Sequence, residues 1–109
     1  MIYELRRYQC VPGKMAALHN MMTDVALEIC ERHGIKLLGA WETMIGDTEQ
    51  TYVCLYEFNG MDERNAKWDA FFGDPDWQSA RAEIAKRDGQ FLVSSSSTFL
   101  KAAPYSPIR

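Results

Sequence analysis

The spacing of the apolar residues changes at Pro12-Gly13, and this change constrains the fold more than any other feature of the sequence. Residues 2–11 (IYELRRYQCV) alternate between two faces, as a β-strand does. After the turn the apolar residues recur three and four positions apart, as on one face of a helix that ends before Gly34. The residues on that helical face are Met15, Leu18, Met22, Val25 and Ile29. The chain is therefore predicted to begin with a strand, a tight turn and a helix.

A hairpin is predicted in the middle of the chain. Residues 36–45 (KLLGAWETMI) and 51–58 (TYVCLYEF) carry the aromatic and β-branched side chains that are typical of strands. Residues 46–49 between them can form a short turn. We therefore expect the two strands to pair in an antiparallel hairpin.

Two helices and a last strand complete the prediction. Residues 61–73 have their acidic residues early and end in glycine, which suits a short helix. A second helix is expected within residues 74–89, because Asp74 can cap it and Pro75 suits its first position. Residues 90–101 are expected to form the fourth strand. The order β-α-β-β-α-α-β is that of an α+β ferredoxin-like fold, in which a four-stranded antiparallel sheet carries its helices on one face.

Length and composition limit the class of protein. The 109 residues suit one domain, residues 1–109. A formal net charge of −3 argues against broad binding to nucleic-acid phosphates, which needs a basic surface. No apolar run is long enough to span a membrane, and the first ten residues lack the pattern of a signal peptide. The three cysteines have no CxxC spacing and indicate reduced thiols, although an odd count does not exclude one disulfide. We expect a cytoplasmic protein with neither nucleic acid nor membrane as a partner.

Both faces of the predicted strands carry large apolar side chains. In the strand at 51–58 both alternating sets are apolar, with Tyr52, Cys54, Tyr56 and Phe58 on one face and Val53 and Leu55 on the other. In the strand at 36–45 the alternation sets Leu37 and Trp41 against Leu38, Ala40 and Met44. An exposed apolar sheet face usually marks an interface, and the simplest cover is the sheet of a second copy. The alternative is that aromatic residues are simply common in strands.

Four segments of the chain resemble, in the same order, segments of the NIPSNAP family. MIYELRRYQCVPGKM resembles its opening strand, Pro-Gly-Lys turn and helix, and RHGIKLLGAWET resembles the segment after that helix. GDPDWQ resembles the family's Asp-Pro-x-Trp helix start, and LKAAPYSP its closing Pro-aromatic-Ser-Pro. The resemblance implies a ferredoxin-like monomer that pairs through its sheet face into a homodimer, a dimeric α/β barrel. It does not imply one reaction, because related barrels include monooxygenases, isomerases, cyclases and proteins with no known activity.

Arg6 and Tyr8 share one face of the first strand and form the predicted ligand site. A guanidinium fork with a phenol beside it can bind a carboxylate, a phosphate or a phenolate. Trp41, Trp68 and Trp77 are predicted to supply flat apolar walls, and Tyr56 adds an aromatic ring on the third strand.

One alternative for Arg6 remains open at this stage, and a metal site formed by the two histidines is excluded. Arg6 could instead form a cross-strand ion pair with Glu42 or Glu57. His19 and His33 lie on one helix, about 21 Å apart at the usual helical rise, so they cannot share a metal ion. No metal site and no cofactor are predicted.

The serine run at residues 94–97 interrupts an otherwise apolar strand. Ser95 and Ser97 are expected on one face, where small hydroxylated side chains would leave space for a ligand. The alternative is an edge strand that tolerates small polar groups. The proline-containing tail cannot extend a ladder and is expected to cross a neighbouring surface, with Tyr105 as a possible anchor on a partner subunit.

These residues predict a protein that binds a small organic ligand, aromatic or acidic. If it is an enzyme, a cofactor-independent monooxygenase or an isomerase fits best. The alternative is a non-catalytic binding or interaction dimer. An RNA-recognition module has the same strand order, and Tyr8 and Tyr56 occupy its stacking strands, but the chain is acidic and lacks the basic-Gly-aromatic motif of that module.

Overall fold

The computed structural model describes residues 1–46 and 50–108 of the chain. The strands are β1 (Ile2–Cys10), β2 (Lys36–Glu42), β3 (Thr51–Phe58) and β4 (Leu92–Leu100). The helices are α1 (Met15–Met21), the π-helical segment η1 (Met22–Ala26), α2 (Leu27–Arg32), α3 (Met61–Gly73) and α4 (Pro75–Asp88). The element order confirms the predicted β-α-β-β-α-α-β, and α1, η1 and α2 follow one another as the single predicted first helix.

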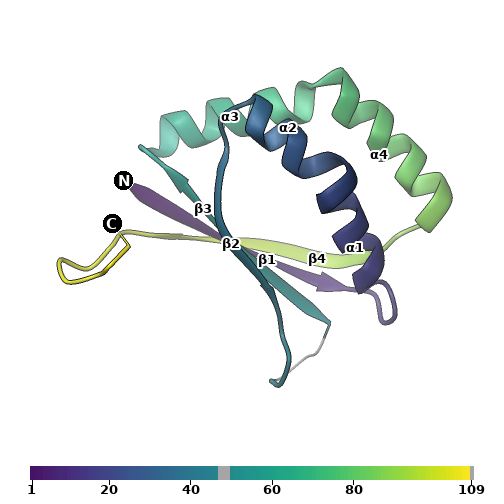
Figure 1. Ribbon diagram of the computed structural model, residues 1–109, viewed down its shortest axis with the longest axis horizontal. Coiled ribbons are helices and arrows are strands. Elements are labelled where there is room, and N and C mark those ends of the chain that lie inside the picture. The colour runs from purple at the N-terminus through teal and green to yellow at the C-terminus, as the bar shows by residue number, and fades with distance from the viewer. Residues whose placement is uncertain (47–49, 109) are drawn as a thin grey trace.

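The strands form one antiparallel sheet in the order β2-β3-β1-β4. All helices lie on the same side of this sheet, as Figure 1 shows. This is the ferredoxin-like arrangement, and it places β4 at one edge of the sheet, as predicted. The side of the sheet that carries the helices is called the helix-facing side below, and the other the open face.

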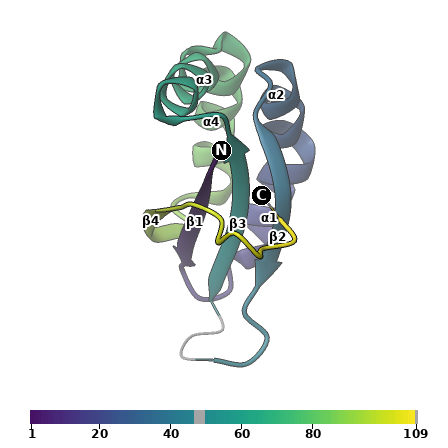
Figure 2. The same cartoon turned by 90° about the vertical axis from the view of Figure 1, so that its left-hand side faces the viewer.

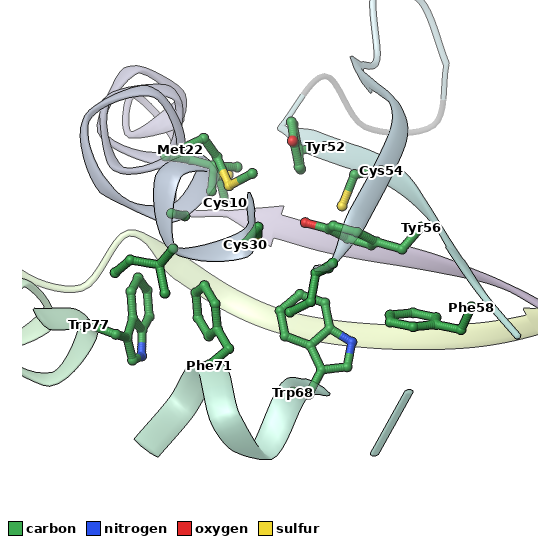
Figure 3. Close-up of a cluster of buried hydrophobic side chains, with 14 residues drawn as sticks. Cys10, Met22, Cys30, Tyr52, Cys54, Tyr56, Phe58, Trp68, Phe71 and Trp77 are labelled. Carbon is green, nitrogen blue, oxygen red and sulfur yellow. The ribbon is translucent and has the colours of Figure 1, made fainter. Parts of the chain in front are cut away.

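The core lies between the sheet and the helices (Figure 3). β3 contributes every second residue to it, and all four are buried: Tyr52, Cys54, Tyr56 and Phe58. The helices add Leu18, Met22, Ile29, Trp68, Phe71 and Trp77. Cys10, Cys30 and Cys54 are buried free thiols, which confirms the prediction of unpaired cysteines. No helix within residues 1–46 and 50–108 is long and apolar enough to cross a membrane.

The chain after β4 crosses the open face of its own sheet. Figure 2 shows this segment passing in front of the strands. It covers Tyr3, which is only 4% exposed, and borders a cavity of about 480 Å³ beside Leu55. Tyr105 is 88% exposed and therefore anchors nothing within its own subunit.

The second strand differs from its prediction in its length and in the side of the sheet to which its residues point. It ends at Glu42 rather than at residue 45, and residues 47–49 of the predicted turn lie outside the described part of the chain. The pairing with β3 shifts between Leu37 and Gly39, where a bulge inserts one residue. Leu37 and Ala40 therefore share the helix-facing side, so the expected opposition between them was wrong. Trp41 pairs with Val53, and its ring lies over Gly39 on the open face.

Candidate functional site

β1 presents three polar residues in alternation on the helix-facing side of the sheet: Glu4, Arg6 and Tyr8. Their partners on β3 are Tyr56, Cys54 and Tyr52, and their partners on β4 are Phe99, Ser97 and Ser95. Because directly paired residues point to the same side of a sheet, these side chains form one continuous surface beneath α3. The site is thus fixed by strand register and not by a loop.

Glu4 lies at the centre of this surface and is fully buried. Its Oε1 accepts hydrogen bonds from Arg64 Nε at 3.0 Å and from Trp68 Nε1 at 2.9 Å. Its Oε2 accepts from Ser97 Oγ at 2.7 Å, Arg64 Nη2 at 2.9 Å and Arg6 Nη1 at 3.1 Å. Every acceptor position of the carboxylate is engaged.

These partners keep Glu4 ionised despite its burial. Burial is the largest single influence and would raise the pKa of the carboxyl. The hydrogen bonds from Arg64, Ser97 and Trp68 and the charge of Arg6 outweigh it and lower the pKa from 4.5 to about 2. Glu4 is therefore a fixed anion at neutral pH and is a poor proton acceptor for catalysis.

Arg6 is held from two sides but keeps one end of its guanidinium available. Its Nε donates to the hydroxyl of Tyr8 at 2.8 Å and its Nη1 to Glu4 at 3.1 Å. The guanidinium carbon lies 5.1 Å from the centre of the Trp68 ring, a cation–π contact. The side chain is 15% exposed, and its Nη2 donates to no other side chain in residues 1–46 and 50–108. This nitrogen therefore keeps its capacity to donate to a further acceptor.

The ion pair of Arg6 has a different partner from the two considered in the sequence. Arg6 pairs with Glu4 of its own strand, so the predicted partners Glu42 and Glu57 were wrong. Glu57 pairs instead with Lys36, and Glu42 with His19.

Tyr8 can donate its hydroxyl proton to a ligand. Its oxygen accepts the hydrogen bond from Arg6 Nε, which leaves the O–H free to donate elsewhere. Burial, the largest influence, raises the pKa of Tyr8, although the charge of Arg6 lowers it in part. Tyr8 is therefore a neutral phenol at pH 7, stacked on Tyr52 with ring centres 5.8 Å apart.

The charges of this cluster do not cancel. Arg6 and Arg64 contribute two guanidinium groups, and Glu4 contributes the one carboxylate that pairs with both. The cluster therefore carries one surplus positive charge, in a protein whose net charge is −3. Because the interior screens charges weakly, this surplus favours an anionic ligand.

The serine run leaves the helix-facing side of β4 uncovered. Ser95, Ser97 and Phe99, called the serine strip below, point to the helix-facing side, and all three are exposed. Ser94 and Ser96 lie on the open face with Gln9 and Arg7. The strip lies directly beside Arg6 and Tyr8, so this edge of the polar cluster is bordered by small, exposed side chains.

The other predicted site residues have separate places. Tyr56 is buried against Trp68, with ring centres 5.1 Å apart, and belongs to the core below the site. Trp41 is 55% exposed on the opposite face of the sheet and is not brought near Arg6. Trp77 of α4 packs on Phe71 at 4.8 Å, and its buried Nε1 finds no acceptor in the described residues.

Arg64 was missed by the sequence reasoning. The signal was present, because Arg64 and Trp68 are four residues apart and so lie on the same face of α3. Their common face could have been matched to the acidic position of β1. Among the residues that the structure describes, no group of three or more His, Cys, Asp or Glu could hold a metal ion.

The order of the strands and the placement of all described helices on one side of the sheet define this chain as a ferredoxin-like α+β protein. The cluster around Glu4 lies on the helix-facing side of that sheet. A putative antibiotic biosynthesis monooxygenase from Nitrosomonas europaea shares this fold, with a TM-score of 0.63 at 8% identity over 94% of this chain and 98% of the other. That likeness shows the fold alone.

The family model for NIPSNAP matches residues 3–107, and the chain belongs to the NIPSNAP family. An uncharacterized NIPSNAP domain protein from Burkholderia xenovorans has a TM-score of 0.84 at 26% identity, over 98% of this chain and 99% of the other. A NIPSNAP family protein with unknown function from Agrobacterium tumefaciens has a TM-score of 0.86 at 25% identity, over 100% and 94%. No curated protein matches the chain. The resemblance found in the sequence is thus confirmed.

Proposed function

We propose that this protein binds a small organic anion with a flat or apolar body at Arg6 and Tyr8. The observation that carries the proposal is the surplus positive charge of the cluster, where Arg6 Nη2 has no side-chain partner among the described residues. Arg6 supplies one charged donor and Tyr8 a neutral one, which suits a carboxylate or a phenolate. Trp68 and Phe72, stacked at 5.8 Å, give an apolar wall for the body of the ligand.

The chemistry of the site favours a reaction in which the substrate forms an electron-rich anion, such as an enolate or a phenolate. Tyr8 can donate a proton, but Glu4 cannot accept one readily because its pKa is held low. Arg6 and Tyr8 would stabilise an enolate or phenolate as it forms. This is the common requirement of the two expected reaction classes, isomerisation and cofactor-independent monooxygenation.

In the monooxygenase case one oxygen atom of O₂ enters the substrate, and the other leaves as water with two substrate hydrogens. The fold neighbour from Nitrosomonas europaea carries that putative activity in its name. A binding role without turnover uses the same contacts. An oxygen-uptake assay with an electron-rich phenolic acid such as 2,4-dihydroxybenzoate distinguishes monooxygenation from binding without turnover. Oxygen uptake that Arg6→Ala abolishes would support monooxygenation at this site.

A homodimer through the open face is part of this proposal. Leu5, Val53 and Leu55 lie on that face, and Trp41 and Leu100 remain exposed there. Such a face on a folded domain is usually covered by a partner. A cytoplasmic location is proposed because all three cysteines are buried free thiols.

The binding proposal is tested by titrating isotope-labelled protein with benzoate and following its NMR spectrum. We expect benzoate to shift signals from Arg6, Tyr8 and the serine strip, and the neutral analogue benzamide to bind more weakly. A charged hydrogen bond of this kind contributes about 1.5–3 kcal/mol, so Arg6→Ala should weaken benzoate binding about tenfold or more. Tyr8→Phe should weaken it less, because the ring and its stacking remain.

Arg7→Ala is the matched control. Arg7 neighbours Arg6 in the strand but is exposed on the opposite face. Equal binding of benzoate and benzamide, or equal losses in the Arg6 and Arg7 variants, would show that the site does not bind anions.

A further inference from the structure

An apolar cavity of about 280 Å³ lies where α4 meets the beginning of β4. Its walls include Met21, Trp77, Ile84, Phe91 and Leu92. Most of these walls are hydrocarbon or aromatic, with Arg81 at the exposed rim.

On the helix side, the cavity is connected to Arg6 by a row of aromatic rings. The guanidinium of Arg6 lies 5.1 Å from the Trp68 ring, and Trp68 stacks on Phe72 at 5.8 Å. Phe72 in turn lies 6.4 Å from Trp77, which lines the cavity. Figure 3 shows Trp68, Phe71 and Trp77 side by side along the helices that cover the sheet. These rings therefore form an unbroken series of neighbours from Arg6 to the cavity, in which Phe72 is 46% exposed and Trp68 and Trp77 are buried.

On the sheet side, the strand register joins the same two places. Arg6 pairs with Ser97, Tyr8 with Ser95 and Cys10 with Leu92, a cavity residue. The four residue steps from Arg6 to Cys10 span about 13 Å at the usual rise of a strand. Tyr8 and Ser95 lie between the two ends, and the side chain of Ser95 is small and exposed.

We infer that the ligand of this protein is an amphiphilic monocarboxylate, with its carboxylate on Arg6 and Tyr8 and a medium-length apolar tail in the cavity. The inference rests on the function proposed above. With C–C bonds of about 1.5 Å, eight carbons in a zigzag chain cover roughly 10 Å. The hydrogen bond from the carboxylate to the guanidinium adds about 3 Å, so an eight-carbon acid fits the span.

The opposite orientation, with the carboxylate on Arg81, is less favourable. Arg81 is exposed, and an ion pair in water contributes little. Arg6 is largely buried beside a surplus of positive charge, where the same contact is screened less. The ligand therefore has a defined direction along β4.

The experiment is a calorimetric titration of the whole protein with butanoate, hexanoate, octanoate and decanoate. Each buried methylene contributes about 0.8 kcal/mol, so affinity should rise about fourfold per methylene up to about eight carbons and then level off. Arg6→Ala should weaken all four acids by a similar factor. Arg81→Ala should leave them unchanged.

A cavity-filling variant tests the place of the tail. Ala85 is an exposed wall residue of the cavity, and Ala82 is exposed on the same helix outside it. Ala85→Trp should remove the gain with chain length and keep the binding of butanoate, whereas Ala82→Trp should change neither.

Each contrary result has a distinct meaning. Arg6-dependent binding with no dependence on chain length would overturn the inference and leave the anion site standing. Loss of octanoate binding in Arg81→Ala would show the reverse orientation and overturn it as well. If none of the acids binds, the proposed function is wrong and the inference falls with it.

Discussion

The buried carboxylate of Glu4 offers the sharpest perturbation of the structure. Glu4→Gln keeps the shape of the side chain but removes its charge and replaces one acceptor oxygen by a donor. Five donor groups converge on this carboxylate, from Arg6, Arg64, Trp68 and Ser97. The new amide nitrogen would face at least two of these donors, and two guanidinium groups would lose their counter-charge.

The expected cost is large for a single substitution. Breaking a buried ion pair by removing one partner costs about 3–5 kcal/mol. The pKa of Glu4 gives an independent figure. It falls from 4.5 to about 2 on folding, and at about 1.4 kcal/mol per pKa unit this corresponds to roughly 3 kcal/mol at neutral pH. We therefore expect Glu4→Gln to lower the free energy of unfolding by about 3 kcal/mol at pH 7.

The same carboxylate contributes to the loss of stability in acid. Because the folded pKa lies below the unfolded one, the contribution of Glu4 is fully present above about pH 4.5 and is lost as pH falls towards about 2. Wild-type protein should lose stability across that window. Glu4→Gln has no such group, so the difference between the two proteins should shrink as pH falls.

Urea unfolding at pH 7, 5, 4 and 3 measures both effects. Glu42→Gln is the matched control, because Glu42 is exposed and pairs only with His19 in the described residues. Its cost should stay within about 1 kcal/mol. A loss below 1 kcal/mol in Glu4→Gln, or a difference from wild type that does not change with pH, would refute the account of this cluster.

Two further predictions concern the open face and the serine strip. Sedimentation at micromolar concentration should show about twice the chain mass, and Leu55→Lys should abolish this pairing or cause aggregation, because a buried charge without a partner costs several kcal/mol; a monomer in the wild type would contradict the proposed dimer. Ser95→Val should keep or raise the melting temperature and weaken benzoate binding, because valine favours strands and fills the strip. Ser94→Val on the open face is the control and should leave binding unchanged. A lower melting temperature in Ser95→Val alone would show that the strip is packed and not a ligand site.

The strands and helices were largely predictable because their periods are clear in the sequence. β3 and α3 have the predicted bounds, since each is delimited by turn residues or glycine. The side of the sheet to which the β2 residues point was missed, because a bulge at Leu38 adds one residue to the alternation. Gly39 was the available signal, since a glycine inside a strand pattern often marks a bulge. The π-helical segment η1 leaves the apolar spacing of its helix almost unchanged.

The polar site was predictable in part. The spacing of Arg6 and Tyr8 placed them on one face, and alternation along β4 placed Ser95 and Ser97 together. Arg64 joins them only through the packing of α3 on the sheet, which is a tertiary contact. Strand register decides the ion pairs of Arg6 and Glu57. Arg6 and Glu4 share the helix-facing side of β1, whereas Glu57 lies opposite Tyr3 on the open face and pairs with Lys36.

The position of a bound carboxylate tests the central claim most directly. A crystal structure of the protein with benzoate would locate it. The account predicts a carboxylate oxygen about 3 Å from Arg6 Nη2, within hydrogen-bonding reach of the Tyr8 hydroxyl, with the ring against Trp68 or Phe72. Benzoate bound away from Arg6, with the guanidinium still paired only to Glu4 and Tyr8, would contradict it.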